Sequence, residues 1–170
     1  MLVRENENIW ETWSAAQKSD LIHNYVMRYS DRNSRKMDYG TGEHYTAVEV
    51  HILEKIYFHP GITVTELAEL TSRTKGAASQ IVAKLYEKEL ITKVPQEDDA
   101  KKRSLLITPK GEQLNKFHMD YDERMAKKFF GIVSQYYSSE QMDAFFKVME
   151  TSFLLLSPSS EYSWLHDDLI

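Results

Sequence analysis

The apolar residues of this chain recur mainly at helical spacing. The first stripe, at i, i+3, i+4 and i+7, consists of Ile22, Tyr25, Val26 and Tyr29. Three further apolar residues lie upstream of it: Ile9, Trp10 and Trp13. The stripe predicts an amphipathic helix over residues 9–36. Gly40 and Gly42 then break the periodicity, so residues 36–45 are expected to form a loop.

The segment after this loop opens with the sequence of a capping box. In that motif a Thr side chain accepts the backbone N–H three residues on, and a Glu there accepts the backbone N–H of the Thr. Thr46 and Glu49 have this spacing and predict a helix start. The helix is expected to stop at His59-Pro60-Gly61. Its apolar face consists of Val48, Ile52, Leu53 and Ile56.

Two shorter helices are predicted next. Thr63 and Glu66 have the spacing of a second capping box, and Ile62 and Leu67 have that of a hydrophobic staple. Thr74 is expected to cap the following helix. The inner face of that helix consists of Ala78, Ile81 or Val82, and Leu85. Two helices joined by a tight turn form a helix-turn-helix.

A β-hairpin and two long helices complete the pattern. Leu90–Val94 and Ser104–Thr108 are short β-prone segments joined by a charged tip. Pro109 suits the first turn of a long helix that reaches about Tyr137. A last helix is expected to begin near Ser139, with an apolar stripe of Met142, Phe145, Phe146, Met149 and Phe153. A helix-turn-helix followed by a basic hairpin is the layout of a winged-helix DNA binder.

The distribution of charge agrees with this interpretation, although the whole chain has a net charge of −5. Residues 71–110 carry nine basic and five acidic side chains, a net charge of +4. Residues 1–70 carry a net charge of −4 and residues 111–170 carry −5. The one basic segment is therefore the predicted winged helix, and the acidic flanks are expected to restrain nonspecific DNA binding.

The composition narrows the class of protein. A chain of 170 residues that is 42% hydrophobic is expected to form one compact domain with helical extensions. Because cysteine is absent, disulfides, thiol redox sensing and thiolate metal ligands are excluded. A soluble, cytoplasmic protein is expected, because we find no signal-like segment and no apolar run of about 18 residues. An enzyme is not expected, because the nucleophile elbow, the P-loop and the Rossmann glycine pattern are all missing.

Five short segments carry a resemblance to a known family. They are Glu66-Leu67-Ala68, Lys84-Leu85, Leu90-Ile91, Asp99-Ala100-Lys101 and Ile107-Thr108-Pro109-Lys110-Gly111. In their order and spacing they resemble the MarR family of winged helix-turn-helix transcriptional regulators, over nearly the whole chain. The resemblance implies an obligate homodimer held together by the first helix and the last two helices. It also implies that each wing enters a minor groove of DNA.

The expected fold class is mainly α with a small β-wing, a winged helix-turn-helix flanked by long N- and C-terminal dimerisation helices. The expected parts are residues 1–45 (N-terminal dimerisation helix and loop), 46–111 (DNA-binding domain), 112–157 (C-terminal dimerisation helices) and 158–170 (tail). The aromatic stripe of the last helix has a second interpretation, as ordinary intrachain core. The tail is either a frayed acidic end or a short amphipathic segment docked on the dimer.

Candidate DNA contacts lie on the recognition helix and the wing. Those on the helix are Thr74, Lys75, Gly76, Ala77, Ser79, Gln80 and Lys84. Gln pairs with adenine, Lys donates to guanine, and small residues let the backbone approach the bases. The basic cluster Lys101, Lys102 and Arg103 fits contact with the minor groove and with phosphate. The alternative is that Ser79 and Gln80 are only solvated.

Two positions depart from the family pattern. The family has Asp-x-Arg in the wing, whereas this chain has Asp99-x-Lys101 with Arg103 two residues later, so the residue that enters the groove is left open. The family usually ends its recognition helix with Gly, where this chain has Glu89. Because a left-handed residue other than Gly costs about 1 kcal/mol, the helix is expected to end differently here.

The resemblance also implies an effector. Many family members release DNA when a small aromatic or phenolic ligand enters between the dimer helices and the winged helix. The candidate lining residues are Trp13, Tyr25, Tyr29, His51, Tyr57 and Phe117. The alternative is that these residues are core aromatics.

A metal-responsive regulator of the same fold is an alternative hypothesis. His118 and Asp122 have the i, i+4 spacing of ligands on one helix, and His51 resembles a position used by zinc-responsive members. Such a set suits zinc or manganese, although an exposed His–Asp pair often arises without a metal. No other cofactor is expected.

The predicted function is that of a transcriptional repressor that binds a pseudo-palindromic operator as a homodimer. The expected partners are double-stranded DNA and a second copy of the chain, without a membrane. A winged helix used as a protein-interaction module is the other alternative. Such a module would have an acidic or apolar recognition face, and Lys75 and Lys84 argue against it.

Overall fold

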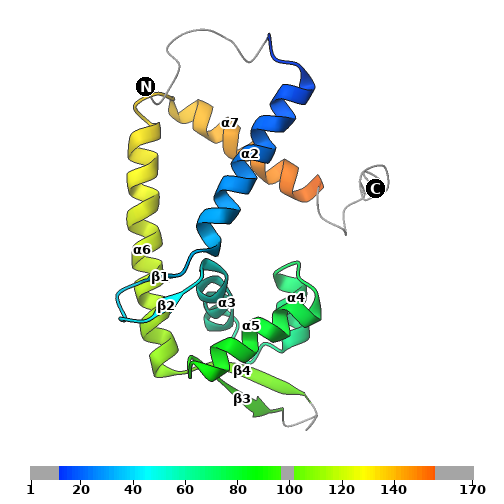
Figure 1. Ribbon diagram of the computed structural model, residues 1–170, viewed down its shortest axis with the longest axis vertical. Coiled ribbons are helices and arrows are strands. Elements are labelled where there is room, and N and C mark those ends of the chain that lie inside the picture. The colour runs from blue at the N-terminus through cyan, green and yellow to red at the C-terminus, as the bar shows by residue number, and fades with distance from the viewer. Residues whose placement is uncertain (1–11, 97–101, 156–170) are drawn as a thin grey trace. The chain divides into compact units, whose positions relative to one another are not determined.

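The computed structural model describes residues 12–96 and 102–155. The helices are α2 (Ala15–Ser34), α3 (Ala47–Phe58), α4 (Val64–Leu70), α5 (Lys75–Glu87), α6 (Pro109–Val133) and α7 (Ser139–Leu155). The strands are β1 (Met37–Asp38), β2 (His44–Tyr45), β3 (Ile91–Pro95) and β4 (Arg103–Ile107). The expected class, mainly α with a small β-wing, is confirmed (Figure 1). Among the described residues, no helix is both long and apolar enough to cross a bilayer.

The described chain divides into two compact units, with the boundary between Arg124 and Met125. The first contains α2, both hairpins, α3 to α5 and the beginning of α6, and the second contains the rest of α6 with α7. This boundary is not one of those predicted for the functional parts, which are residues 1–45, 46–111, 112–157 and 158–170. The division into functional parts stays a prediction.

The hydrophobic core of the first unit lies within the winged helix. Its largest buried side chains include Leu53, Ile56, Leu67, Leu85, Leu90, Ile91, Leu105 and Leu114. These residues come from α3, α4, α5, both strands of the wing and the first turns of α6, except Leu90, which lies between α5 and β3. The recognition helix is therefore held by the same core as the wing.

The helix starts predicted by capping residues are confirmed. Thr46 and Glu49 form a complete capping box at α3, and Thr63 and Glu66 form another at α4. The Thr74 hydroxyl accepts the backbone N–H of Ala77 and so caps α5. Each cap satisfies amides that the first helical turn leaves without a partner.

The predicted N-terminal helix is interrupted at residues 13–14. Its main part begins at Ala15, because the Ser14 side chain accepts the backbone N–H of Gln17 and the Gln17 side chain accepts that of Ser14. This capping box marks the boundary in place of the apolar periodicity. The upstream apolar residues Ile9 and Trp10 lie outside the described residues.

The prediction of a plain loop over residues 36–45 is wrong. β1 and β2 pair antiparallel there, with Met37 opposite Tyr45. The Asp38 carboxylate accepts the backbone N–H groups of Gly40, Thr41 and Gly42, at 2.7, 2.9 and 3.1 Å. These three bonds close the turn that joins the strands.

The remaining boundaries differ by a few residues from those predicted. Both wing strands are displaced by one residue, to Ile91–Pro95 and Arg103–Ile107. α6 ends at Val133 rather than near Tyr137, since the Ser138 hydroxyl accepts the backbone N–H of Gln141 and starts α7. The start of the last helix near Ser139 is confirmed, and of these two helices only the end of α6 differs from the prediction.

Candidate nucleic-acid interface

The recognition helix α5 has a buried face and an exposed face. Ala78, Val82 and Leu85 are buried in the core, and Ile81 is half-buried. The side chains of Lys75, Ser79, Gln80 and Lys84 are exposed, as is Gly76, while Ala77 is half-buried. The cap Thr74 is exposed at the start of the helix. The exposed set combines an amide, a hydroxyl and two cations on one helix, which are groups of the kind that contact bases and phosphates.

The recognition helix ends in a left-handed residue although that residue is Glu89 rather than Gly, contrary to the expectation of a different helix end. Glu89 has a φ of 59°, in the left-handed region where Gly is preferred. Its N–H donates to Tyr86 O, and the N–H of Leu90 donates to Leu85 O, both at 2.9 Å. This pair of bonds is a Schellman motif. The buried Leu90 side chain holds the chain in this turn, so the fold tolerates the strained Glu89.

The wing is anchored at its base. The β3–β4 ladder runs from Ile91 opposite Ile107 to Pro95 opposite Arg103, and the Gln96 N–H extends it by donating to Lys102 O at 3.2 Å. β4 also exchanges two 3.0 Å hydrogen bonds with the chain before α4, from Gly61 N–H to Leu105 O and from Leu105 N–H to Ile62 O. Lys102 and Arg103 are exposed, and Lys101 lies outside the described residues.

Two exposed cations of this surface were missed by the sequence reasoning. Arg73 immediately precedes the cap of α5, and Lys93 lies on β3 with its Nζ 4.8 Å from the centre of the Tyr86 ring. The signal was present, because both belong to the basic segment 71–110. Lys93 packed on Tyr86 places a cation between the recognition helix and the wing.

The candidate effector residues have different neighbours. Tyr25 and Tyr29 stack on each other along α2, with ring centres 6.2 Å apart, and both are exposed. Tyr57 packs against Phe58. Trp13 lines an open hollow beside the first turns of α2. Phe117 approaches Gly40 and packs against the core, and His51 pairs with His118. Whether an effector binds any of them stays a prediction.

The candidate metal ligands do come together. His51 Nδ1 lies 3.3 Å from His118 Nε2, and Asp122 Oδ2 lies 3.5 Å from the same nitrogen. Glu54, which the sequence reasoning missed, joins them: donor atoms of His51, Glu54 and His118 all lie within 4.8 Å of one another. Its signal was the His-x-x-Glu spacing on α3. Burial lowers the pKa of His118, partly offset by Asp122, so a neutral imidazole faces the other ligands.

The sequence of the winged helix matches that of a known family. Residues 45–102, from β2 through α3, α4, α5 and β3, match the model of the MarR family. This segment is a MarR-family domain by that match. This family consists of transcriptional regulators rather than enzymes.

A curated relative and several solved structures are similar to this chain. An uncharacterised HTH-type transcriptional regulator of Bacillus subtilis, YhjH, is 28% identical over 108 residues, which are 62% of this chain and 62% of that protein. Among solved structures, Streptococcus pneumoniae FabT in complex with DNA has a TM-score of 0.63 and 20% identity, over 83% of this chain and 94% of that chain.

Two further structures share the fold. Zinc-responsive ZitR of Lactococcus lactis has a TM-score of 0.63 and 19% identity, over 82% of this chain and 99% of that chain. A mutant of MarR from E. coli complexed with operator DNA has a TM-score of 0.64 and 16% identity, over 79% of this chain and 91% of that chain. At these identities the likeness establishes the fold, and the roles of individual residues must be argued from this chain.

Proposed function

We propose that this protein is a sequence-specific DNA-binding transcriptional repressor that binds a pseudo-palindromic operator as a homodimer. The observation that carries the proposal is the exposed face of α5, on which Lys75, Ser79, Gln80 and Lys84 lie opposite the buried face. Ser and Gln read base edges in the major groove, and Lys neutralises phosphate or donates to guanine. The basic wing beside this helix supplies contacts to the backbone and minor groove.

The experiment is fluorescence anisotropy with the DNA upstream of the gene, against a scrambled duplex, at several salt concentrations. Each phosphate contact adds about 0.9 to the slope of log K against log salt. The Lys102→Ala, Arg103→Ala double variant is expected to flatten the slope on both duplexes. Gln80→Ala is expected to reduce the preference for the operator with a smaller general loss. Lys18→Ala, on the first turns of α2, is the matched control for loss of a positive charge.

The outcomes separate the alternatives. Equal binding of both duplexes by the parent protein contradicts sequence-specific recognition. No binding even at low salt contradicts DNA binding altogether and favours a protein-interaction module. An unchanged slope in the wing variant contradicts the assignment of the wing.

The flanking helices support the homodimer. α2 and α7 contain no buried residue among those described. α7 exposes an apolar stripe of Phe145, Phe146, Met149 and Phe153, and α2 exposes Leu21, Ile22, Tyr25, Val26 and Tyr29. Contiguous exposed apolar surface of this kind is unfavourable in water and marks an interface. Sedimentation equilibrium is expected to give a dimer for the parent and a monomer for Phe146→Glu, and a monomeric parent would contradict this part of the proposal.

Release of the operator by a small aromatic ligand belongs to the same proposal. The support is the aromatic content of α2, where Tyr25 and Tyr29 stack in an exposed position. Titrating phenolic acids into the preformed complex is expected to lower the anisotropy. A panel without effect would contradict regulation by this ligand class.

A metal-responsive repressor is the second candidate, favoured by the His51–Glu54–His118 cluster. Zinc ligands lie about 2.0–2.1 Å from the ion, so tetrahedral neighbours lie roughly 3.3 Å apart. The separations of His118 Nε2 from His51 Nδ1 and Asp122 Oδ2, 3.3 and 3.5 Å, match this value. The residues present therefore fit zinc, which would link α3 to α6.

A second observation concerns the other side of the His118 ring. Its buried Nδ1 has no hydrogen-bond partner among the described residues, and neither has the buried Oδ1 of Asn115 one turn before it. When Nε2 binds a metal, Nδ1 carries the proton and needs an acceptor, a role that the Asn115 oxygen suits chemically. Metal-ligating His residues usually donate in this way.

Calorimetric titration of chelator-treated protein tests this candidate. The parent is expected to bind one zinc ion per chain, and His51→Ala, which changes an exposed side chain, is expected to lose that binding while keeping its thermal midpoint. If His51→Ala binds zinc as the parent does, the cluster is not the site. If zinc binds without changing operator affinity, the metal is not the effector.

A further inference from the structure

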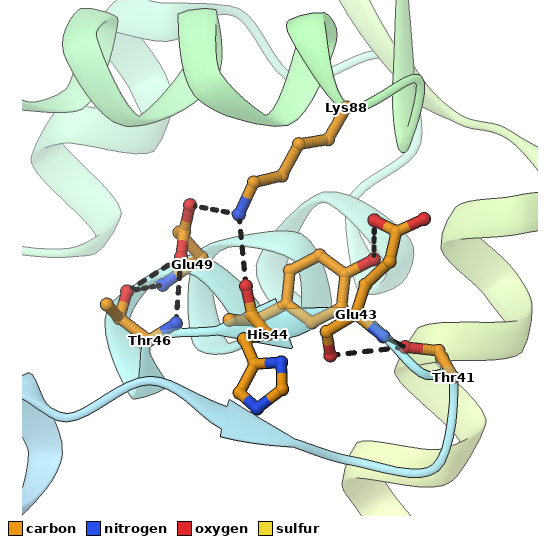
Figure 2. Close-up of polar contacts among 7 residues, drawn as sticks. Thr41, Glu43, His44, Thr46, Glu49 and Lys88 are labelled. Carbon is orange, nitrogen blue, oxygen red and sulfur yellow. Dashed lines mark hydrogen bonds and ion pairs between the residues drawn. The ribbon is translucent and has the colours of Figure 1, made fainter.

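Lys88 lies at the end of the recognition helix, yet its side chain is turned toward α3. Its Nζ is 2.8 Å from Glu49 Oε1 (Figure 2). The same nitrogen is 4.5 Å from the centre of the Tyr45 ring. The Lys88 side chain is 28% exposed and that of Glu49 only 7%. A cation that contacts DNA must present its charge to the solvent side of the helix. Lys88 instead packs its stem and charge against the body of the domain.

The carboxylate that receives Lys88 is fixed on its other side. Glu49 Oε2 accepts the backbone N–H of Thr46 at 2.7 Å and its hydroxyl at 3.0 Å, within the capping box of α3. Burial alone would raise the pKa of Glu49, but the hydrogen bonds from Lys88 and Thr46 outweigh it, so the pKa lies below its ordinary value. The charged carboxylate is therefore a rigid anchor between the first turn of α3 and the last turn of α5.

The β1–β2 hairpin extends this anchor to α6. The Tyr45 hydroxyl donates to Glu43 Oε2 at 2.8 Å, and Glu43 Oε1 pairs with Lys110 Nζ at 2.9 Å. Burial and the bond to Glu43 raise the pKa of Tyr45 to about 12, so its hydroxyl keeps the proton that it donates. One polar network thus joins the hairpin after α2 to the end of α5 and the start of α6.

We propose that Lys88 is a positioning residue for DNA recognition, which holds the end of the recognition helix on Glu49 and Tyr45 and does not contact phosphate. This inference rests on the proposed function, and it assigns to the Glu49–Lys88 pair the orientation of the helix that reads the operator. The hairpin of residues 37–46 connects this pair to the rest of the fold, because Tyr45 contacts Lys88 and Glu43 contacts Lys110.

The direction in which Glu49→Gln changes DNA affinity distinguishes a positioning role of Lys88 from a purely electrostatic role of the Glu49 charge. Glu49→Gln removes a negative charge near a polyanion, which on charge alone strengthens DNA binding. Gln also keeps the acceptor of the capping box. The positioning role predicts the opposite sign, a loss of operator affinity of about tenfold, because Lys88 loses its charged partner.

Lys88 is tested with two variants and a comparison on the same helix. Lys88→Met keeps the apolar stem and is expected to weaken operator binding about tenfold with an unchanged salt slope. Lys88→Arg keeps the charge and is expected to retain affinity within about threefold. Lys84→Ala, which removes an exposed cation, is expected instead to lower the slope by about 0.9. The double variant Glu49→Gln, Lys88→Met is expected to bind no more weakly than Lys88→Met, since both changes remove one interaction.

A measurement without DNA keeps this inference separate from the proposed function. Amide hydrogen exchange at Glu89 and Leu90 is expected to accelerate in Lys88→Met and Glu49→Gln, and to stay unchanged in Lys84→Ala. Unchanged exchange in the first two variants overturns the proposal, whatever the parent protein does with DNA. A flattened salt slope in Lys88→Met, together with tighter binding by Glu49→Gln, overturns it as well and makes Lys88 a phosphate contact. Equal binding of operator and scrambled duplex by the parent defeats only the proposed function.

Discussion

Replacing Glu89 by Gly is expected to stabilise the protein. Glu89 occupies the left-handed position of the Schellman motif that ends α5, with a φ of 59°. A residue with a Cβ pays about 1–2 kcal/mol for this conformation, because the Cβ crowds the following carbonyl oxygen. Gly avoids that cost. Its greater conformational freedom, however, stabilises the unfolded chain and lowers the free energy of unfolding by roughly 0.5–1 kcal/mol. The net gain in the free energy of unfolding is therefore about 0.5–1 kcal/mol.

Chemical denaturation followed by circular dichroism measures this gain, at one fixed protomer concentration because dimerisation would shift the midpoint. The thermal midpoint is expected to rise by about 2 °C. Glu89→Ala is the matched control: it removes the same charge but keeps the Cβ, and we expect no comparable gain. If Ala stabilises as much as Gly, the charge is responsible and the backbone argument is refuted. A loss of stability in Glu89→Gly would refute it too.

Three further changes test the packing around the interface. Gly111→Ala would make a Cβ overlap with the backbone oxygen of Leu90, so a loss of more than about 2 kcal/mol in the free energy of unfolding is expected. Thr74→Ala removes the acceptor of the Ala77 N–H and is expected to cost about 1 kcal/mol, which Thr74→Ser restores; equal losses in both would show that the hydroxyl is not the cap. Leu53→Ala, at a fully buried side chain, is expected to cost about 2–5 kcal/mol, and a loss below 1 kcal/mol would contradict its place in the core.

Local signals explain why much of the fold was predictable. The capping boxes of Thr46 and Thr63 each lie within four residues, so the chemistry that starts α3 and α4 is visible in the sequence. The same holds for the inner face of α5, since apolar residues at helical spacing have one way to meet a core. Gly111 is a related case: its place in the resemblance is explained by the close approach of the Leu90 carbonyl, which leaves no room for a Cβ.

Contacts between distant residues explain what was missed. The β1–β2 hairpin depends on Met37 pairing with Tyr45 and on the Asp38 carboxylate, and Gly40 and Gly42 in the sequence indicated only a loop. Glu54 was not a candidate ligand: its His-x-x-Glu spacing with His51 is visible in the sequence, but only the fold brings it close to His118 on another helix. The helix end at Glu89 was predicted wrongly for a similar reason, since the energy that holds it comes from burial of Leu90.

The basic segment shows the same limit at the candidate interface. Counting charges marked residues 71–110, with nine basic side chains, as the basic segment of the chain, but the count gave each of them equal weight. The structure separates them: Lys88 pairs with Glu49, and Lys110 pairs with Glu43. Both carboxylates come from residues outside that segment, so the sequence count included cations whose charge is already neutralised within the fold. The positive charge available to phosphate is therefore concentrated on the exposed face of α5 and on the wing. For the same reason, removing Glu43 or Glu49 alters helix support rather than only the net charge.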